Sequence, residues 1–452
     1  MSLFSTLIST TSSMQAYEKS LNVIQNNVSN ADSPAFARQQ LQFIPRRFDP
    51  RNSLTGGVDA GALLSSRDEY TERNLWRQNQ GLGRSAQRSA DLAQIEPFFP
   101  VSENSGVGGA LNSFFASVSS WSINPNDPAS RQVVLERADF LARTFNQNAE
   151  ALGDASNSAD RQIRNTVDQV NRLTSHIQEL NIEFRSDRRK LEDAGLDADL
   201  HATLEDLSEL VDFNAIRQED GSVQIFFGGQ TPLVLGDKSF PLRADFSAGL
   251  PRLLDVEDRD ITAQLTDGRL KGIFETRTET IPSYLADLDT LAATLADRVN
   301  QTLAAGVDTS GANPTLDLFT YDPTVGSALT LKTNPLEPGD LAAAEAYSPG
   351  GNGNALALTR LATSNEIGDL SFSEYYGQIA ARAGRDLSRA KDKEQVQQGL
   401  VTQARTLRQE RSGVSLDEEA ARLVEAQRAY QANAQLFKVL SELTDTLMGI
   451  LR

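Results

Sequence analysis

Both ends of this 452-residue chain carry a narrow apolar seam on a long predicted helix. In each segment apolar residues recur at alternating steps of three and four, which is the spacing of a heptad. The N-terminal pattern stops near Ser29, where residues 29–34 are turn formers and helix breakers. The C-terminal pattern begins after Gly413, with acidic residues in its first turn. We expect an assembly interface at the seam residues Leu7, Met14, Tyr17, Leu21, Ile24, Val28, Leu423, Tyr430, Asn433, Phe437, Leu440 and Leu447.

A narrow seam requires a partner helix, because it is too thin to cover a broad core. Since both ends have one, the sequence predicts that the terminal helices pair as a coiled coil. The resulting inner terminal-helix domain comprises residues 1–40 with 412–452.

The middle of the chain is predicted to be a long helical bundle, a central domain of residues 41–212 with 266–411. Strand character, with apolar and polar residues alternating, appears only in residues 213–265. The fold class is therefore mainly α with a small β-rich insertion. Helices are also expected over residues 68–95, 128–186, 200–211, 271–305 and 371–410. The polar stretch 153–160 is expected to kink or break the second of these. Irregular chain is expected over 35–65 and 306–370.

Charge and composition exclude several classes of function. The net charge is −18 at pH 7, so the chain repels nucleic acid and anionic lipid, and we expect neither as a partner. No run of eighteen apolar residues is present, and the N-terminus lacks the features of a signal peptide. We therefore expect a cytoplasmic protein or one exported without cleavage.

No catalytic, cofactor or metal site is predicted, and we expect that the chain is not an enzyme. It has two histidines and no cysteine, which rules out the usual zinc ligand sets. Residues 81–86 match a loose dinucleotide-binding pattern, but that pattern needs a preceding strand and residues 68–80 look helical. The acidic residues of 255–260 lack the glycine and the final glutamate of an EF-hand loop, which favours a solvated edge.

Two motifs resemble the axial proteins of the bacterial flagellum. Residues 21–30 (LNVIQNNVSN) are similar to the N-terminal motif of rod, hook and hook-associated proteins, and residues 412–419 (SGVSLDEE) to their C-terminal motif. The segment 268–275 (GRLKGIFE) resembles the hook-associated protein 1 family, whose members join hook to filament. Pro34-Ala35-Phe36 stands where the axial proteins have Pro-Gly-Tyr, which puts a left-handed turn at Ala35 into question.

This resemblance implies a structural subunit of the flagellum, located outside the cell and secreted through the flagellar type III apparatus without a cleaved signal peptide. The implied partners are like subunits in a ring, the hook protein, hook-associated protein 3 or another filament-side junction protein, and an export chaperone with the export apparatus. The alternatives are another axial protein, such as the hook protein or hook-associated protein 3, and an intracellular coiled-coil scaffold.

Overall fold

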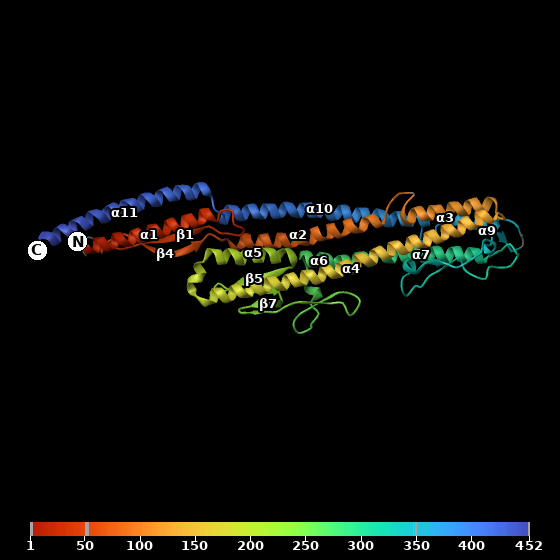
Figure 1. The fold of residues 1–452 in the computed structure, drawn as a ribbon, viewed down its shortest axis with the longest axis horizontal. Helices are drawn as coiled ribbons and strands as arrows, with labels where there is room; N and C mark the ends of the chain where they lie inside the picture. The colour runs from red at the N-terminus through yellow and green to blue at the C-terminus, as the bar shows by residue number, and fades with distance from the viewer. Residues whose placement is uncertain (1–2, 50–53, 103, 347, 349, 451–452) are drawn as a thin grey trace.

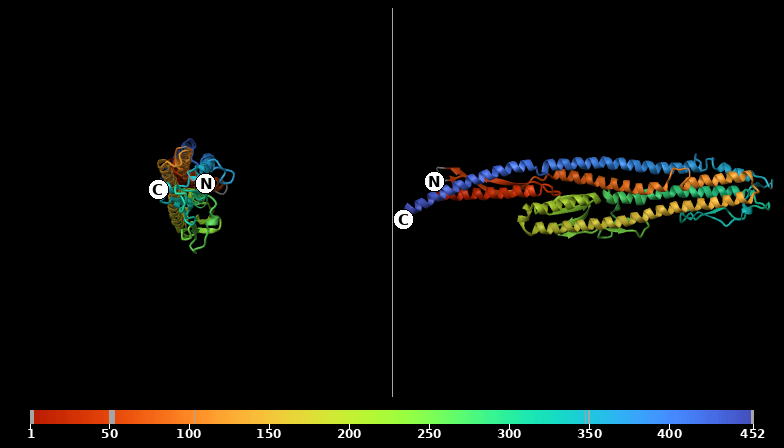
Figure 2. Two further views of the ribbon diagram at one scale, coloured as in Figure 1. Left: turned by 90° about the vertical axis from the view of Figure 1, so that its right-hand side faces the viewer. Right: turned by 45° about the horizontal axis from the view of Figure 1, so that its top comes forward.

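The computed structural model describes residues 3–49, 54–102, 104–346, 348 and 350–450, and it is a long, narrow rod (Figure 1). The two chain ends lie side by side at one end of the rod, in both side views (Figures 1 and 2). Helix α1 (Leu3–Ser29) and helix α11 (Leu416–Ile450) form this end together with strands of residues 39–65, and the elements from residue 69 to residue 412 form the body. The predicted pairing of the terminal segments as helices is confirmed.

Two antiparallel helices, α2 (Glu69–Ile95) and α10 (Phe372–Ser412), run along one long edge of the body (Figure 1). Helix α4 (Pro128–Ser186) runs along the opposite side. The bundle is completed by α3 (Gly106–Ile123), α5 (Ala194–Leu210), α6 (Gly268–Glu275), α7 (Ile281–Ala304), α8 (Ser327–Thr330) and α9 (Gly353–Leu361).

Helix α4 is continuous, so the predicted alternative of a break at 153–160 is wrong. Asp127 caps its N-terminus by accepting hydrogen bonds from the backbone N–H groups of Ala129 and Ser130. Leu152 and Ala159 are buried on either side of the polar stretch. The apolar face therefore passes through this stretch, and packing keeps the helix continuous despite the intervening glycine and serines.

Among the described residues, the body has two large hydrophobic cores and a small third cluster between α2 and α10. The core at the far end lies between α3, the first half of α4, α7, α9 and the start of α10. The core nearer the terminal helices lies between the second half of α4, α5, α6 and a β-sheet. Helix α4 belongs to both cores, which explains its length.

The β-rich segment packs on the body rather than standing apart. Its four-stranded sheet has the order β5 (Phe213–Arg217), β6 (Val223–Phe227), β7 (Thr231–Leu235), β8 (Lys238–Ser239), and a hairpin of β9 (Arg243–Asp245) and β10 (Arg252–Leu254) follows. The alternate residues Val223, Ile225 and Phe227 are buried in the core shared with α4 and α5. The fold class is as predicted, while the division into domains stays a proposal.

The expectation of irregular chain over 35–65 is wrong. Strands β1 (Gln39–Pro45) and β4 (Val58–Ser65) form an antiparallel ribbon, extended by β2 (Phe48–Asp49) and β3 (Leu54–Thr55). The ribbon lies along α1, and this support explains why a polar, proline-containing segment forms strands.

Residues 306–370 are largely irregular, as predicted, but include α8, α9 and short elements that the pattern did not indicate. These are β11 (Gly306–Val307), β12 (Phe319–Thr320), β13 (Lys332–Thr333), β14 (Ala344–Glu345) and the 3-10 turn Pro338–Asp340.

The glycines of the loose dinucleotide pattern lie inside α2, and one of them is required by packing. A Cβ on Gly83 would overlap the carbonyl oxygen of Glu209, whereas a Cβ on Gly81 would meet only the side chain of Gln397. Gly83→Ala is therefore expected to destabilise the fold by about 1–3 kcal/mol, because backbone atoms cannot yield as a flexible side chain does. Urea unfolding checks this, with Gly81→Ala as the matched control. Equal effects at both positions would contradict the prediction.

Candidate assembly site: the terminal helices and their joint with the body

Helix α1 lies between two partners, α11 and the β1–β4 ribbon. The predicted seam residues of α1 therefore differ in burial. Ile24 is buried, Val28 is 44% exposed, and Leu7, Met14, Tyr17 and Leu21 are half-buried. Tyr17 packs against Phe43 of the ribbon, with ring centroids 5.2 Å apart. The buried residues of α1 are Ser9, Thr10, Ser13, Ala16, Ile24 and Asn27.

Small polar residues let the ribbon approach α1 closely. The Ser9 hydroxyl donates to the carbonyl of Gly56, and the backbone N–H of Val58 donates to the Ser13 hydroxyl at 3.1 Å. A Cβ on Gly57 would collide with the Ser9 hydroxyl. A heptad search overlooks these serines because it scores apolar residues only. The spacing Ser9, Ser13, Ala16 on one helix face, with paired glycines downstream, was the available signal.

On α11 the predicted seam faces α1, with one exception. Leu440 is buried, and Leu423, Tyr430, Asn433 and Phe437 are half-buried, whereas Leu447 is 46% exposed. The Asn433 amide donates to the carbonyl of Ala429 in its own helix at 2.8 Å.

A second apolar face of α11 is not covered by α1. Leu436, Val439, Leu443 and Leu447 are spaced by three and four residues and are each about half exposed. An apolar face exposed along a helix marks an interaction surface. The structure brings together the two helix ends as predicted but leaves this face open.

A buried polar contact joins the two ends of the chain where α1 meets the body. The Asn27 side chain donates to the Glu419 carboxylate at 3.0 Å and to the Gln39 carbonyl at 2.9 Å, and it accepts from the Gln39 N–H. Arg38 donates to the same carboxylate at 2.7 Å. Asn27 and Glu419 are each about 1% exposed, so these bonds are shielded from water. Both residues belong to the two family-like motifs, but their pairing across the chain was not predicted.

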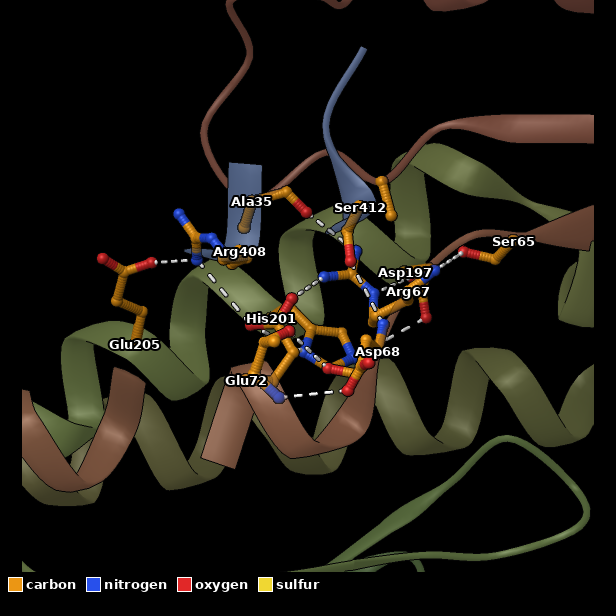
Figure 3. A network of polar contacts seen from close by, with 12 residues as sticks. Ala35, Ser65, Arg67, Asp68, Glu72, Asp197, His201, Glu205, Arg408 and Ser412 are labelled. Atoms are coloured by element: carbon orange, nitrogen blue, oxygen red, sulfur yellow. Dashed lines mark hydrogen bonds and ion pairs between the residues drawn. The ribbon is translucent and has the colours of Figure 1, made fainter. Parts of the chain in front are cut away.

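A buried ion network forms the joint between the terminal helices and the body (Figure 3). Arg67 donates to Glu72 at 2.6 Å, to Asp197 at 2.8 Å and to the carbonyl of Ala35 at 2.7 Å. Arg67 therefore connects the loop after α1 with α2 and α5. Arg408 of α10 lies 3.7 Å from the Glu72 carboxylate.

Ala35 adopts a left-handed conformation, with φ of +56°. An alanine in this region costs roughly 1–2 kcal/mol, which its surroundings must offset. The hydrogen bond from Arg67 to the Ala35 carbonyl is one such compensation. The turn that glycine would permit is thus present in this chain without glycine.

Ser412, at the end of α10, ties the terminal helices to α2. Its carbonyl accepts from the Arg38 N–H at 2.9 Å, and its hydroxyl accepts from the N–H of Asp68, the residue that caps α2, at 3.1 Å. The chain enters and leaves the body at this point, so the joint fixes the direction of both terminal helices.

Burial governs the protonation of the network. Burial raises the pKa of Glu72, although Arg67 and Arg408 act against it. Burial also lowers the pKa of His201 well below 6.5, and Arg67 adds to this shift. Burial would raise the pKa of Asp197, but Arg67, His201 and Arg217 together lower it.

His201 makes stability depend on pH. A histidine whose pKa is lowered by folding is stabilising above its unfolded pKa of about 6.5, and that stability is lost as pH falls below it. Between pH 6.5 and 5.5 we expect a loss of about 1 kcal/mol in the free energy of unfolding.

His201→Gln should remove this loss, as urea unfolding over pH 5.5–7 would measure. His176, the other histidine, has a side chain that is 42% exposed, and it provides the matched control in His176→Gln. An unchanged slope with pH in His201→Gln would contradict the assignment. The raised pKa of Glu72 has the opposite effect on stability. As the pH falls, Glu72 becomes protonated, and the cost of burying its charge is lost, which stabilises the fold.

Within the described part of the chain, no group of three or more His, Asp or Glu side chains is placed to hold a metal ion. No described helix is long and apolar enough to cross a membrane.

Two family models match the chain. The model of the flagellar hook-associated protein FlgK helical domain matches residues 92–319, half of the chain, and the model of the flagellar basal body rod FlgEFG protein C-terminal region matches residues 407–450.

Relatives match over nearly the whole length. Flagellar hook-associated protein 1 of Bacillus subtilis (strain 168) is 25% identical over 494 residues, with 96% of each chain covered. The protein of the same name from Escherichia coli (strain K12) is 23% identical, with 97% of this chain and 98% of the relative covered.

The flagellar hook junction protein FlgK from Burkholderia pseudomallei has a similar structure, with a TM-score of 0.66 and 15% identity. The match covers 75% of this chain and 99% of that one, and at this identity it supports the fold alone.

Proposed function

This chain belongs to the family of the flagellar hook-associated protein FlgK, and from this membership we propose that it is a structural subunit of the hook–filament junction. Relatives from two bacteria bear the name flagellar hook-associated protein 1. Their similarity to this chain favours the junction function over that of the hook protein or hook-associated protein 3. An intracellular scaffold does not fit membership of a flagellar family.

The observation that carries the proposal is the placement of the chain ends. Both family-like motifs meet where one helix pair joins the body, and towards the tip of the rod α11 keeps an apolar face open (Figure 1). Paired helices with an uncovered apolar face are suited to assembly with further helices. The twelve predicted seam residues belong to this pair, and we propose that they serve assembly. Those between the two helices hold the pair together, whereas Leu447 lies on the open face of α11.

Several finer points of the proposal rest on the same family membership. The chain is a flagellar component, and we expect it outside the cell, exported through the flagellar channel without a cleaved signal peptide. We expect contacts with like subunits in a ring, with the hook protein, and with hook-associated protein 3 or another filament-side junction protein. An export chaperone would bind before secretion. Catalysis is not part of the proposed role.

Electron microscopy of cells that lack the chain tests the function. We expect hooks without filaments and flagellin released into the medium, with filaments restored by the wild-type gene. Filaments of normal number in the deletion strain would overturn the proposal. Labelled protein located away from the hook–filament boundary would do the same.

A further inference from the structure

Positive charge gathers on one edge of an otherwise acidic chain. The whole sequence has 43 Lys and Arg against 61 Asp and Glu, whereas α10 has eight Lys and Arg against five Asp and Glu. Arg84 and Arg88 of α2 and Arg389 and Lys393 of α10 line a recess of about 240 Å³ between the two helices. This set of four cations is termed the basic recess.

The charge of the basic recess is only partly neutralised within the molecule. Glu275 binds both Arg84 and Arg88. Asp386, which also lines the recess, accepts from the Tyr284 hydroxyl and lies 4.0 Å from Arg389. No carboxylate among the described residues lies within ion-pair distance of Lys393. Positive charge in a recess attracts a carboxylate-bearing surface of a partner.

A rigid acidic turn lies after β10, at residues 255–260. The buried Asp255 carboxylate accepts from the backbone N–H groups of Glu257 and Arg259, both at 2.9 Å, and so holds the turn together. Asp258 has a left-handed backbone, with φ of +60°, and its side chain is 75% exposed. Asp260 is exposed as well.

Two arginines offset part of this charge, because Arg259 pairs with Asp255 and Glu257, and Arg243 pairs with Asp258. The exposed carboxylate of Asp260 makes no ion pair with a described residue. The turn thus presents acidic groups in a fixed geometry, which lowers the entropy lost when it binds.

The basic recess and the acidic turn cannot meet within one molecule. Helix α10 follows one long edge of the body, and the β5–β10 segment lies on the opposite edge in both side views (Figures 1 and 2). We propose that the basic recess of one copy receives the acidic turn of a second copy beside it. Such a contact joins two different surfaces, and repeated contacts of this kind generate a ring or a helical array. This inference rests on the proposed function, in which copies lie side by side.

Cysteine cross-linking tests the contact directly, because the chain has no native cysteine. Flagella would be isolated from cells whose only copy carries Lys393→Cys with Asp260→Cys, and treated with a short bifunctional maleimide. We expect a ladder of cross-linked copies. Lys391→Cys with Asp260→Cys is the matched control, because Lys391 is exposed but points away from the recess by helix geometry.

The single variants Lys393→Cys and Asp260→Cys should give no ladder, because a contact between unlike surfaces does not bring a residue next to its own copy. A cross-linked dimer in either single variant, or an equal yield from the Lys391 control, would overturn the proposal.

Reversing the charges on both surfaces tests whether the acidic group in the recess comes from a second copy or from another partner. Arg389→Glu with Lys393→Glu should lower the number of filaments by roughly tenfold or more, because like charges facing across an interface are strongly unfavourable. Adding Glu257→Lys and Asp260→Lys to the same chain should restore filaments. A defect without rescue would mean that another partner occupies the recess and would overturn the contact between copies.

The outcomes also distinguish this inference from the proposed function. If the chain is located at the junction but neither the ladder nor the rescue appears, the contact is wrong and the function stands. If the chain is absent from the junction, the proposed function fails as well.

Discussion

Replacing Leu440 with aspartate is expected to abolish filaments while leaving the body folded. Leu440 is the one predicted α11 seam residue that is buried, and it faces α1. Burying a leucine is worth about 1.5–3 kcal/mol, and a carboxylate at the same place adds a desolvation cost. The terminal helices should therefore separate.

The body should tolerate this change because residue 440 belongs to neither of its hydrophobic cores. Two measurements check the expectation: the thermal transition of the purified protein, and filament counts in a complemented deletion strain. The control is Gln435→Asp, which places the same charge on an exposed position of α11.

Filament loss with an unchanged body transition is the expected pair of results. A collapsed transition would mean that Leu440 stabilises the body. Normal filaments would mean that the helix pair is not required for assembly.

Replacing Arg67 with alanine should produce the largest loss of stability. The change leaves Glu72 and Asp197 without their shared cation, and the side chains of all three residues are 10% exposed or less. Removing one partner of a buried ion pair costs about 3–5 kcal/mol. We expect the lower end of this range, because Arg217 still binds Asp197 at 2.6 Å and Arg408 stays near Glu72.

The midpoint of urea unfolding measures this loss, and limited proteolysis reports a local effect. The Ala35 carbonyl loses its hydrogen bond, so cleavage within residues 31–38 should become faster. Arg67→Lys should be intermediate, because an ammonium keeps the charge but cannot reproduce the fork of the guanidinium.

Arg73→Ala is the control, since Arg73 is close to Arg67 in the sequence but is exposed and lies 3.9 Å from an exposed Glu69. Its loss should change stability by no more than about 0.5 kcal/mol. An Arg67→Ala variant as stable as this control would show that the joint network is not a stabilising element.

Much of the fold could be predicted because a helix is indicated by the spacing of residues that are close together in the sequence. Apolar periodicity identified α4, α7 and both terminal helices, alternation identified the sheet, and the helices α2 and α10 were predicted as well. The limits of α1 and α11 followed from the breakers after Ser29 and from Gly413. The ribbon was missed because its strands gain stability from lying on α1, and apolar periodicity in residues 39–65 does not record that support. The only local sign is the Gly56-Gly57 pair, which a search for apolar residues does not score.

The sequence by itself therefore determined the helices, the existence of a seam at each end and the resemblance to a flagellar family. Each depends on residues close together in the chain, where spacing and motif are directly visible. Only the tertiary structure decided which faces are covered. It placed Asn27 against Glu419, 392 residues away, and Arg67 between three separate elements. Such buried polar contacts depend on distance and shielding from water, and neither property is recorded in local sequence.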